Sequence, residues 1–214
     1  MTTLLKEINS YKEVFKKKAP EEKQKLMAQA TKELAELGIA QGLNIGDQVP
    51  DFKLPDATGK VVSITEELAK GPVILSFYRG GWCPYCNLEL KAYQSEVDSI
   101  KDAGATLIAI SPETPDASLS TIEKHDLEFI VLSDDRNKVA EQFDLVFKMP
   151  DYLIEIYKSS GLDVAGRNGN DDWELPKPAT FVIDQTGKIV FAEVDSDYTN
   201  RVEPSKVIDI VKNI

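Results

Sequence analysis

Apolar residues recur at helical spacing over the first 39 residues of the chain. Those of the first run are Leu4, Leu5, Ile8, Tyr11, Val14 and Phe15, and those of the second are Leu26, Met27, Ala30, Leu34 and Leu37. This spacing predicts two helices. Pro20 separates them, because a proline ends a helix or opens the next one, and Gly38 closes the second as a C-cap does. We therefore expect a helical extension over residues 1–43, which covers the following domain or packs on a second subunit.

From Gly46 onward, the spacing between apolar positions shortens to the spacing that is typical of strands. Residues 47–64 carry alternating short apolar positions around the sequence Asp-Ala-Thr-Gly, which predicts a hairpin. Residues 73–78 form a nearly continuous apolar run, as expected of a central strand that is buried on both faces. The helix that follows ends by Gly104, and its inner face carries Cys86, Leu90, Tyr93, Val97 and Ile100.

Strands and helices alternate through the rest of the chain. Further strands are predicted at residues 106–111, 129–132, 180–183 and 188–193. Further helices are predicted at residues 116–125, 136–143, 151–159 and 204–212. A long stretch, 161–178, has the composition of an irregular segment. This alternation predicts an α/β domain over residues 44–214, with helices on both faces of a sheet.

Charge and hydropathy exclude several classes of partner. The chain has 25 Lys and Arg against 36 Asp and Glu, a net charge of −11, so nucleic acid is not expected to be a partner, because phosphate binding needs a basic face. The apolar runs are too short for a membrane helix, which needs roughly 18–20 residues, so no membrane association is expected. The N-terminal segment lacks the apolar core of a secretory signal and contains Glu7 and Glu13. We therefore expect a cytoplasmic protein.

The histidine and cysteine counts exclude more chemistry than the charge does. His125 is the single histidine, and Cys83 and Cys86 are the two cysteines. One histidine removes most catalytic triads and all multi-histidine metal sites. A structural zinc site usually takes four Cys or His ligands, so no metal is expected. Redox chemistry at the Cys-x-x-Cys sequence remains, and two buried structural cysteines are the alternative.

The two cysteines lie where the predicted central strand passes into a helix. The free N–H groups and partial positive charge of a helix N-terminus stabilise a thiolate, which is the reactive form of cysteine. Pro84 suits the first helical turn, and Gly80 and Gly81 allow a tight turn that leaves room for a substrate. Residues i and i+3 share a helical face, so Cys83 and Cys86 can close a small disulfide ring.

Four sequences in the chain together resemble those of the thioredoxin superfamily over residues 46–213. They are GDQVPDFKLPDATG, GPVILSFYRGGWCPYC, GATLIAISPETPDAS and WELPKPATFVIDQTGKI. Within that superfamily the chain looks like a peroxiredoxin-like protein of the alkyl hydroperoxide reductase and thiol-specific antioxidant type. The resemblance implies a thioredoxin fold in its peroxiredoxin-like variant, here with an N-terminal helical extension. It also implies a thiol-dependent peroxidase without a metal or organic cofactor, since the two sulfurs carry both electrons.

The implied substrates are hydrogen peroxide or organic hydroperoxides. The implied reductant is thioredoxin, glutaredoxin or glutathione, and we expect a homodimer.

The site departs from the usual peroxiredoxin pattern, which is Pro-x-x-x-Thr-x-x-Cys. Arg79 takes the place of the proline, Cys83 that of the threonine, and Cys86 that of the peroxide-attacking cysteine. Peroxiredoxins also carry an arginine near the last strands, where this chain has Pro178. A proline at that place is typical of thioredoxins, in which it is normally cis and packs against the disulfide.

Two assignments of the cysteine roles follow from this hybrid pattern. In a peroxidase, Cys86 would attack the peroxide and Cys83 would condense with the sulfenic acid, while Arg79 would replace the missing arginine. In a thiol-disulfide oxidoreductase, Cys83 would attack a disulfide and Cys86 would resolve the intermediate. The Pro-Tyr pair between the cysteines is of the glutaredoxin type and is a hint toward the second reading. The peroxidase is our main interpretation.

The remaining candidates concern the walls of the site. We expect Trp82 and Gly81 beside the sulfurs, with Trp82 shielding them, and Pro178 in the substrate pocket. Trp173 either lines that pocket or anchors its loop. Arg201 follows a strand and could reach the site, whereas a solvated surface position is expected for His125. A binding or scaffold protein with a vestigial site is the alternative of a different class.

Overall fold

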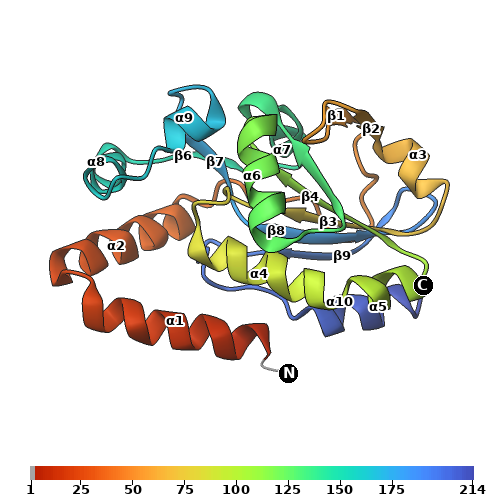
Figure 1. The fold of residues 1–214 in the computed structure, drawn as a ribbon, viewed down its shortest axis with the longest axis horizontal. Coiled ribbons are helices and arrows are strands. Elements are labelled where there is room, and N and C mark those ends of the chain that lie inside the picture. Colours follow the sequence, from red (N-terminus) through yellow and green to blue (C-terminus); the bar gives the residue numbers. More distant parts are fainter. Residues whose placement is uncertain (1–2) are drawn as a thin grey trace.

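The fold is built around a central five-stranded sheet, drawn in Figure 1. The computed structural model describes residues 3–214. The strands of this sheet are β3 (Val73–Phe77), β4 (Thr106–Ser111), β5 (Ile130–Ser133), β8 (Ala179–Ile183) and β9 (Ile189–Val194). Their order is β5-β4-β3-β8-β9. The first three are parallel, and β8 runs antiparallel to both β3 and β9.

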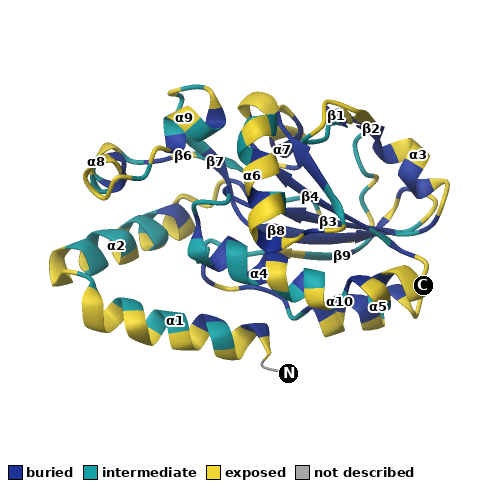
Figure 2. Ribbon diagram, in the orientation of Figure 1, coloured by how far each residue is buried: buried dark blue, intermediate teal, exposed yellow. Residues whose placement is uncertain are grey.

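The central strands are buried on both faces, as Figure 2 shows. All five residues of β3 are buried. Because successive side chains of a strand point to opposite faces, Ile74 joins the apolar core on one side of the sheet and Leu75 that on the other. The continuous apolar run of this segment is explained by these two cores.

Helices cover both faces of the sheet, as predicted. One face is covered by α4 (Pro84–Ser95), α5 (Val97–Asp102), α6 (Pro115–His125) and α10 (Pro204–Val211). The other is covered by α3 (Ile64–Leu68), α7 (Lys138–Gln142) and the hairpin of β1 (Lys53–Pro55) and β2 (Val61–Ser63). The predicted hairpin is thus confirmed. The helix expected after the central strand divides at Glu96 into α4 and α5.

The stretch that we expected to be irregular contains two elements. Helix α9 (Val164–Asn168) begins where the Asp163 carboxylate accepts a hydrogen bond from the Gly166 N–H at 2.9 Å. Strand β7 (Glu174–Pro176) pairs with β6 (Val146–Lys148), and helix α8 (Asp151–Ser159) lies between the two strands in the sequence. The prediction was wrong here because α9 is one capped turn and β7 depends on a distant partner. A 3₁₀ turn, η1 (Asp135–Asn137), precedes α7.

The N-terminal extension forms the two predicted helices, α1 (Leu4–Lys18) and α2 (Glu21–Leu37). Figure 1 shows them as an arm at one side of the sheet, where α1 runs along α4 and α2 reaches toward α8. The N–H groups of Leu4 and Leu5 donate to the Glu203 carboxylate at 3.2 and 2.9 Å. Leu4 and Ile8 are buried against the domain. The extension thus packs on its own chain, whereas its expected boundary at residues 43 and 44 stays a prediction.

Within residues 3–214, none of the helices combines the length and the apolar character that crossing a membrane requires.

Candidate active site

Cys83 and Cys86 lie at the junction of β3 and α4, as predicted. Cys83 is the N-cap of α4, Pro84 is its first residue, and Cys86 lies in its first turn. The preceding loop turns sharply at Gly80, whose φ of +139° favours glycine, and a Cβ there would collide with the Trp82 indole. The Cys83 N–H donates to the Gly80 carbonyl at 3.0 Å. This turn places both sulfurs at the positive end of the helix.

The two thiols are free, buried and electrostatically unlike. Burial alone raises the pKa of Cys83, but a hydrogen bond from Cys86 and the charges of Arg79 and Arg201 lower that pKa to about 6. Burial and the same hydrogen bond hold the pKa of Cys86 well above its ordinary value. These surroundings favour the thiolate at Cys83 and the protonated thiol at Cys86.

An ion pair lies beside Cys86 in the interior. The Arg201 Nη2 donates to the Cys86 Sγ at 3.3 Å, and the Arg201 Nε lies 3.4 Å from the Glu89 Oε2. Burial raises the pKa of Glu89 to about 7, against the opposing charge of Arg201. Arg201 thus reaches the site, as we considered from its position after a strand. Glu89 was missed, although it lies on the same helix as Cys86, one turn further along.

Arg79 lies beside Cys83 in aromatic surroundings. Its Nη2 donates to the Tyr157 hydroxyl at 2.8 Å. Its Cζ lies 4.4 Å from the centre of the Tyr198 ring and 5.0 Å from that of Trp82, within the range of cation–π contacts. The guanidinium is buried at 2% exposure. Tyr157 and Cys83 are the groups that interact most strongly with its charge, and that charge helps to lower the pKa of Cys83.

A cavity of about 230 Å³ opens over Cys83. Cys86 is not among the described residues that line it. The N-terminal helices supply Tyr11, Phe15, Lys23 and Met27, and the domain supplies Arg79, Trp82, Cys83, Pro84, Tyr85, Tyr157, Ser160, Leu162 and Tyr198. Cys83 therefore borders a sheltered space with a largely aromatic wall.

The structure brings Trp82 to this cavity but not the other three predicted wall residues. Gly81 lies below it, where its N–H donates to the Glu113 carboxylate at 2.9 Å and a Cβ would collide with Thr121. Trp173 packs on the apolar cluster of α8, where Lys158 covers its ring, so it anchors its loop. Pro178 lines a smaller cleft beside Arg79.

Pro178 also lacks the cis peptide bond that a thioredoxin-like proline would have, since residues 3–214 contain no cis bond.

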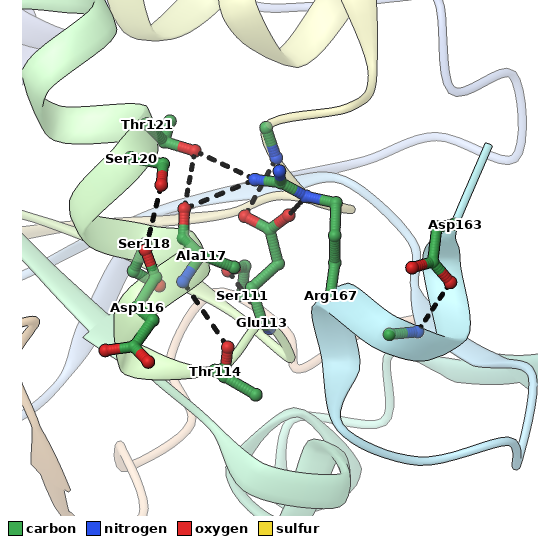
Figure 3. A network of polar contacts seen from close by, with 12 residues as sticks. Ser111, Glu113, Thr114, Asp116, Ala117, Ser118, Ser120, Thr121, Asp163 and Arg167 are labelled. Atoms are coloured by element: carbon green, nitrogen blue, oxygen red, sulfur yellow. Dashed lines mark hydrogen bonds and ion pairs between the residues drawn. The ribbon is translucent and has the colours of Figure 1, made fainter. Parts of the chain in front are cut away.

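A polar network under Gly81 fixes the loop that carries Arg79 and the cysteines. Figure 3 shows Glu113 facing Arg167 of α9, which also contacts the Thr121 hydroxyl and the Ala117 carbonyl on α6. Glu113 is fully buried, and its second carboxylate oxygen accepts from the Gly81 N–H. The sequence did not reveal this pair, because its members lie 54 residues apart.

His125 occupies a different environment from the one expected. Its exposure is 9%, so the interpretation as a solvated residue was wrong. Burial lowers its pKa, and the nearby charges of Lys91 and Lys124 act in the same direction. In the described part of the chain, no group of three or more His, Cys, Asp or Glu side chains is arranged to hold a metal ion.

The known proteins that this chain resembles in sequence include several named as peroxiredoxins. "Peroxiredoxin Q, chloroplastic" from Gentiana triflora is 28% identical over 175 residues, which is 82% of this chain and 68% of that protein. "Peroxiredoxin Bcp" from Bacillus subtilis is 28% identical over 148 residues, covering 69% of this chain and 83% of its own length. "Peroxiredoxin Bcp" from Escherichia coli is 34% identical over 101 residues, covering 47% of this chain and 64% of that protein.

The solved structures support the fold. The crystal structure of peroxidoxin BcpB from Mycobacterium tuberculosis aligns with a TM-score of 0.64 at 24% identity, covering 80% of this chain and 98% of that one. The crystal structure of a cysteine-to-serine mutant of PrxQ from Xylella fastidiosa aligns with a TM-score of 0.60 at 17% identity, covering 80% of this chain and 96% of that one. The predicted thioredoxin fold of the peroxiredoxin-like variant is thus confirmed. The AhpC/TSA family matches residues 45–192, so the predicted resemblance is confirmed as well: this chain belongs to the AhpC/TSA family.

Proposed function

We propose that this chain, a thiol-dependent peroxidase of the peroxiredoxin type, attacks its peroxide with Cys83 and resolves with Cys86. The observation that carries the order is that Cys83 both lines the cavity and has the lower pKa. The family alignment implied the reverse order, with Cys86 attacking. Both cysteines are buried, but Cys86 is not among the described residues that line the cavity, which suits a resolving group.

The first step is a displacement on the peroxide. The Cys83 thiolate attacks one oxygen of ROOH, the O–O bond breaks, and Cys83 becomes a sulfenic acid while RO⁻ leaves and takes a proton. Arg79 is placed to stabilise the thiolate and then the charge that develops on the leaving oxygen. The aromatic residues around it exclude water, which strengthens that interaction.

The second step closes the disulfide. Cys86 loses its proton and attacks the Cys83 sulfur, the S–O bond breaks, and the hydroxyl leaves as water with that proton. Arg201, 3.3 Å from the Cys86 Sγ, stabilises the thiolate as it forms. Glu89, whose pKa of about 7 allows either protonation state at neutral pH, holds Arg201 in place. Two thiols of a reductant then restore both cysteines.

The alternative prediction, a thiol-disulfide oxidoreductase, also begins with an attack by Cys83. Its substrate would be a disulfide, however, and the Cys83 sulfur is poorly accessible to one. Cys83 is only 1% exposed and lies below the N-terminal helices. A disulfide in a folded protein would not reach that sulfur in this conformation, whereas a peroxide would. The thiol reductant must reach the Cys83–Cys86 disulfide by the same route, so in this conformation glutathione fits better than the folded proteins thioredoxin and glutaredoxin.

Rapid mixing of the reduced protein with hydrogen peroxide tests the order, because Trp82 beside Cys83 can report oxidation by its fluorescence. The fast phase is expected to persist in Cys86→Ser and to vanish in Cys83→Ser. Loss of the phase in Cys86→Ser alone would restore the order implied by the alignment. A rate no faster than that of free cysteine in all forms would remove the peroxidase.

Two further expectations stay proposals. The homodimer is supported by three exposed apolar side chains near the end of the extension, Leu37, Ile39 and Ile45, and sedimentation at several concentrations tests it. A cytoplasmic location is the second, although the plant relatives are named chloroplastic.

A further inference from the structure

The cavity over Cys83 is larger than hydrogen peroxide requires. About 230 Å³ is available, whereas one water molecule occupies roughly 30 Å³ in the liquid. The walls are chiefly aromatic and apolar, and such walls favour an organic group. The N-terminal helices supply one side of this space through Tyr11, Phe15 and Met27. The extension is therefore part of the substrate cavity as well as a cover for the domain.

The charges in the cavity wall are of one sign. Arg79 and Lys23 line it, and no Asp or Glu is among the described residues that do so, although the chain carries 36 acidic residues. The Cys83 thiolate balances Arg79 in the reduced protein. Lys23 is a half-buried residue whose ammonium donates to a neutral partner, the Ser160 hydroxyl, at 2.7 Å in an exposed hydrogen bond. One positive charge is thus left over at the far wall.

We infer that the preferred substrate is a small organic hydroperoxide with an apolar body and an anionic end, which Lys23 binds. The peroxide group would meet the Cys83 thiolate and Arg79, while the apolar body packs between the aromatic rings of the wall. The anionic end would receive a charge-assisted hydrogen bond from Lys23. This inference rests on the proposed attack by Cys83 and adds the substrate class and a specificity residue outside the matched family region.

Lys23, the residue that would make the site prefer an anionic substrate, lies in α2. The family match begins at residue 45, so the cation belongs to the extension and not to the shared domain. The overall charge of −11 repels anions. A preference for an anionic hydroperoxide therefore needs a local cation, and Lys23 supplies it.

A pair of matched substrates isolates this charge. The probes are 4-(2-hydroperoxypropan-2-yl)benzoate and its methyl ester, which share the hydroperoxide and the ring and differ in the anion. The second-order rate constant for the oxidation of Cys83 is measured by stopped flow with the full chain, so no reductant is needed. In the wild type, the carboxylate is expected to react roughly threefold faster than the ester, which corresponds to about 0.65 kcal/mol and lies in the range of an exposed ion pair.

The variants are Lys23→Gln and the control Lys25→Gln. Lys25 lies on the same helix, pairs with Glu21 at 2.9 Å and has a side chain 73% exposed. The ratio of the two rate constants should fall to about one in Lys23→Gln and remain at its wild-type value in Lys25→Gln. Lys23→Arg should retain most of the preference, because it keeps the charge.

An equal ratio in the wild type and Lys23→Gln, with the peroxides still oxidising Cys83, would overturn the inference and leave the peroxidase intact. A proportional fall for both substrates in Lys23→Gln would also overturn it, because Lys23 would then only hold the helix in place. If neither substrate nor hydrogen peroxide oxidised wild-type Cys83, the proposed function itself would fail.

Discussion

Cys83 and Cys86 are three positions apart in the chain, and each has an arginine beside it. The two regions differ in the groups that neutralise the charge of that arginine. Around Cys83, Arg79 is surrounded by the rings of Trp82 and Tyr198. Its charge is free to hold a thiolate at the cavity. Around Cys86, Arg201 is already paired with the buried Glu89.

Burial and the neighbouring Cys83 are the larger causes of the raised pKa of Cys86, and the difference between the arginines adds to them in giving one short motif two thiols of opposite character. A cation without a carboxylate partner stabilises the charged form of the sulfur beside it. A cation shared with a carboxylate does so less, and the buried thiol beside it stays protonated. The attacking and the resolving cysteine are therefore distinguished by their surroundings more than by their place in Cys-x-x-Cys.

The largest expected effect concerns Glu89. Its pKa is about 7 in the folded protein against an ordinary value of 4.5, so the folded state holds this proton more tightly than the unfolded chain does. Stability from that proton is complete below pH 4.5 and is lost as the pH rises through 7. Relative to Glu89→Gln, the wild type should lose about 3 kcal/mol of unfolding free energy over this range.

Urea denaturation at several pH values measures that loss. Glu128→Gln is a suitable control, because Glu128 is an exposed carboxyl paired with Lys101. A wild type and a Glu89→Gln variant with parallel pH profiles would show that the carboxyl of Glu89 ionises normally, and the raised pKa of this group would be contradicted.

The next effect concerns Arg79. In Arg79→Met, the pKa of Cys83 should rise because the positive charge beside the thiolate is gone. The rate of peroxide oxidation at pH 6 should fall by at least about fivefold, because a rise of one unit from a pKa of about 6 lowers the thiolate fraction at that pH from about one half to about one eleventh. Stopped-flow measurement of the fast phase tests this.

Arg201→Met provides the comparison for that experiment. It should slow the formation of the disulfide more than the first oxidation, since Arg201 contacts the Cys86 sulfur. An equal effect of both variants on the first step would mean that the two arginines act on one shared thiolate.

The smallest effect concerns the hydroxyl that holds Arg79. Tyr157→Phe removes the partner of the Arg79 Nη2 and leaves a buried N–H without its acceptor. The cost should be about 1 kcal/mol in unfolding free energy. Tyr152→Phe, on the same helix and at a more exposed hydroxyl bonded to Glu33, should cost less. A larger loss in Tyr152→Phe would argue that Tyr157 does not support the arginine.

Much of the fold could be predicted from the sequence, because the pattern of apolar positions is a local signal. The five residues of β3 and the helix boundaries at Pro20 and Pro115 follow from such signals. Strand β7 could not be found, since three residues become a strand only by pairing with β6.

The candidate site was only partly predictable for a related reason. The motif located Cys83, Cys86, Arg79 and Trp82, which are close in the chain. Tyr157 and Arg201, which contact Arg79 and Cys86, come from distant segments, as does Glu113, which holds the Gly81 N–H, and tertiary packing brings all three to the site. The assignment of roles depended on those partners, so it changed once the fold was known.

Site-resolved alkylation tests the central claim most directly. The reduced protein is exposed to iodoacetamide between pH 4 and 10, and mass spectrometry measures the rate at each cysteine. Cys83 should react with half-maximal rate near pH 6, and Cys86 should stay unmodified until well above the ordinary cysteine range. Faster modification of Cys86, or a Cys83 that titrates near pH 9, would contradict the account.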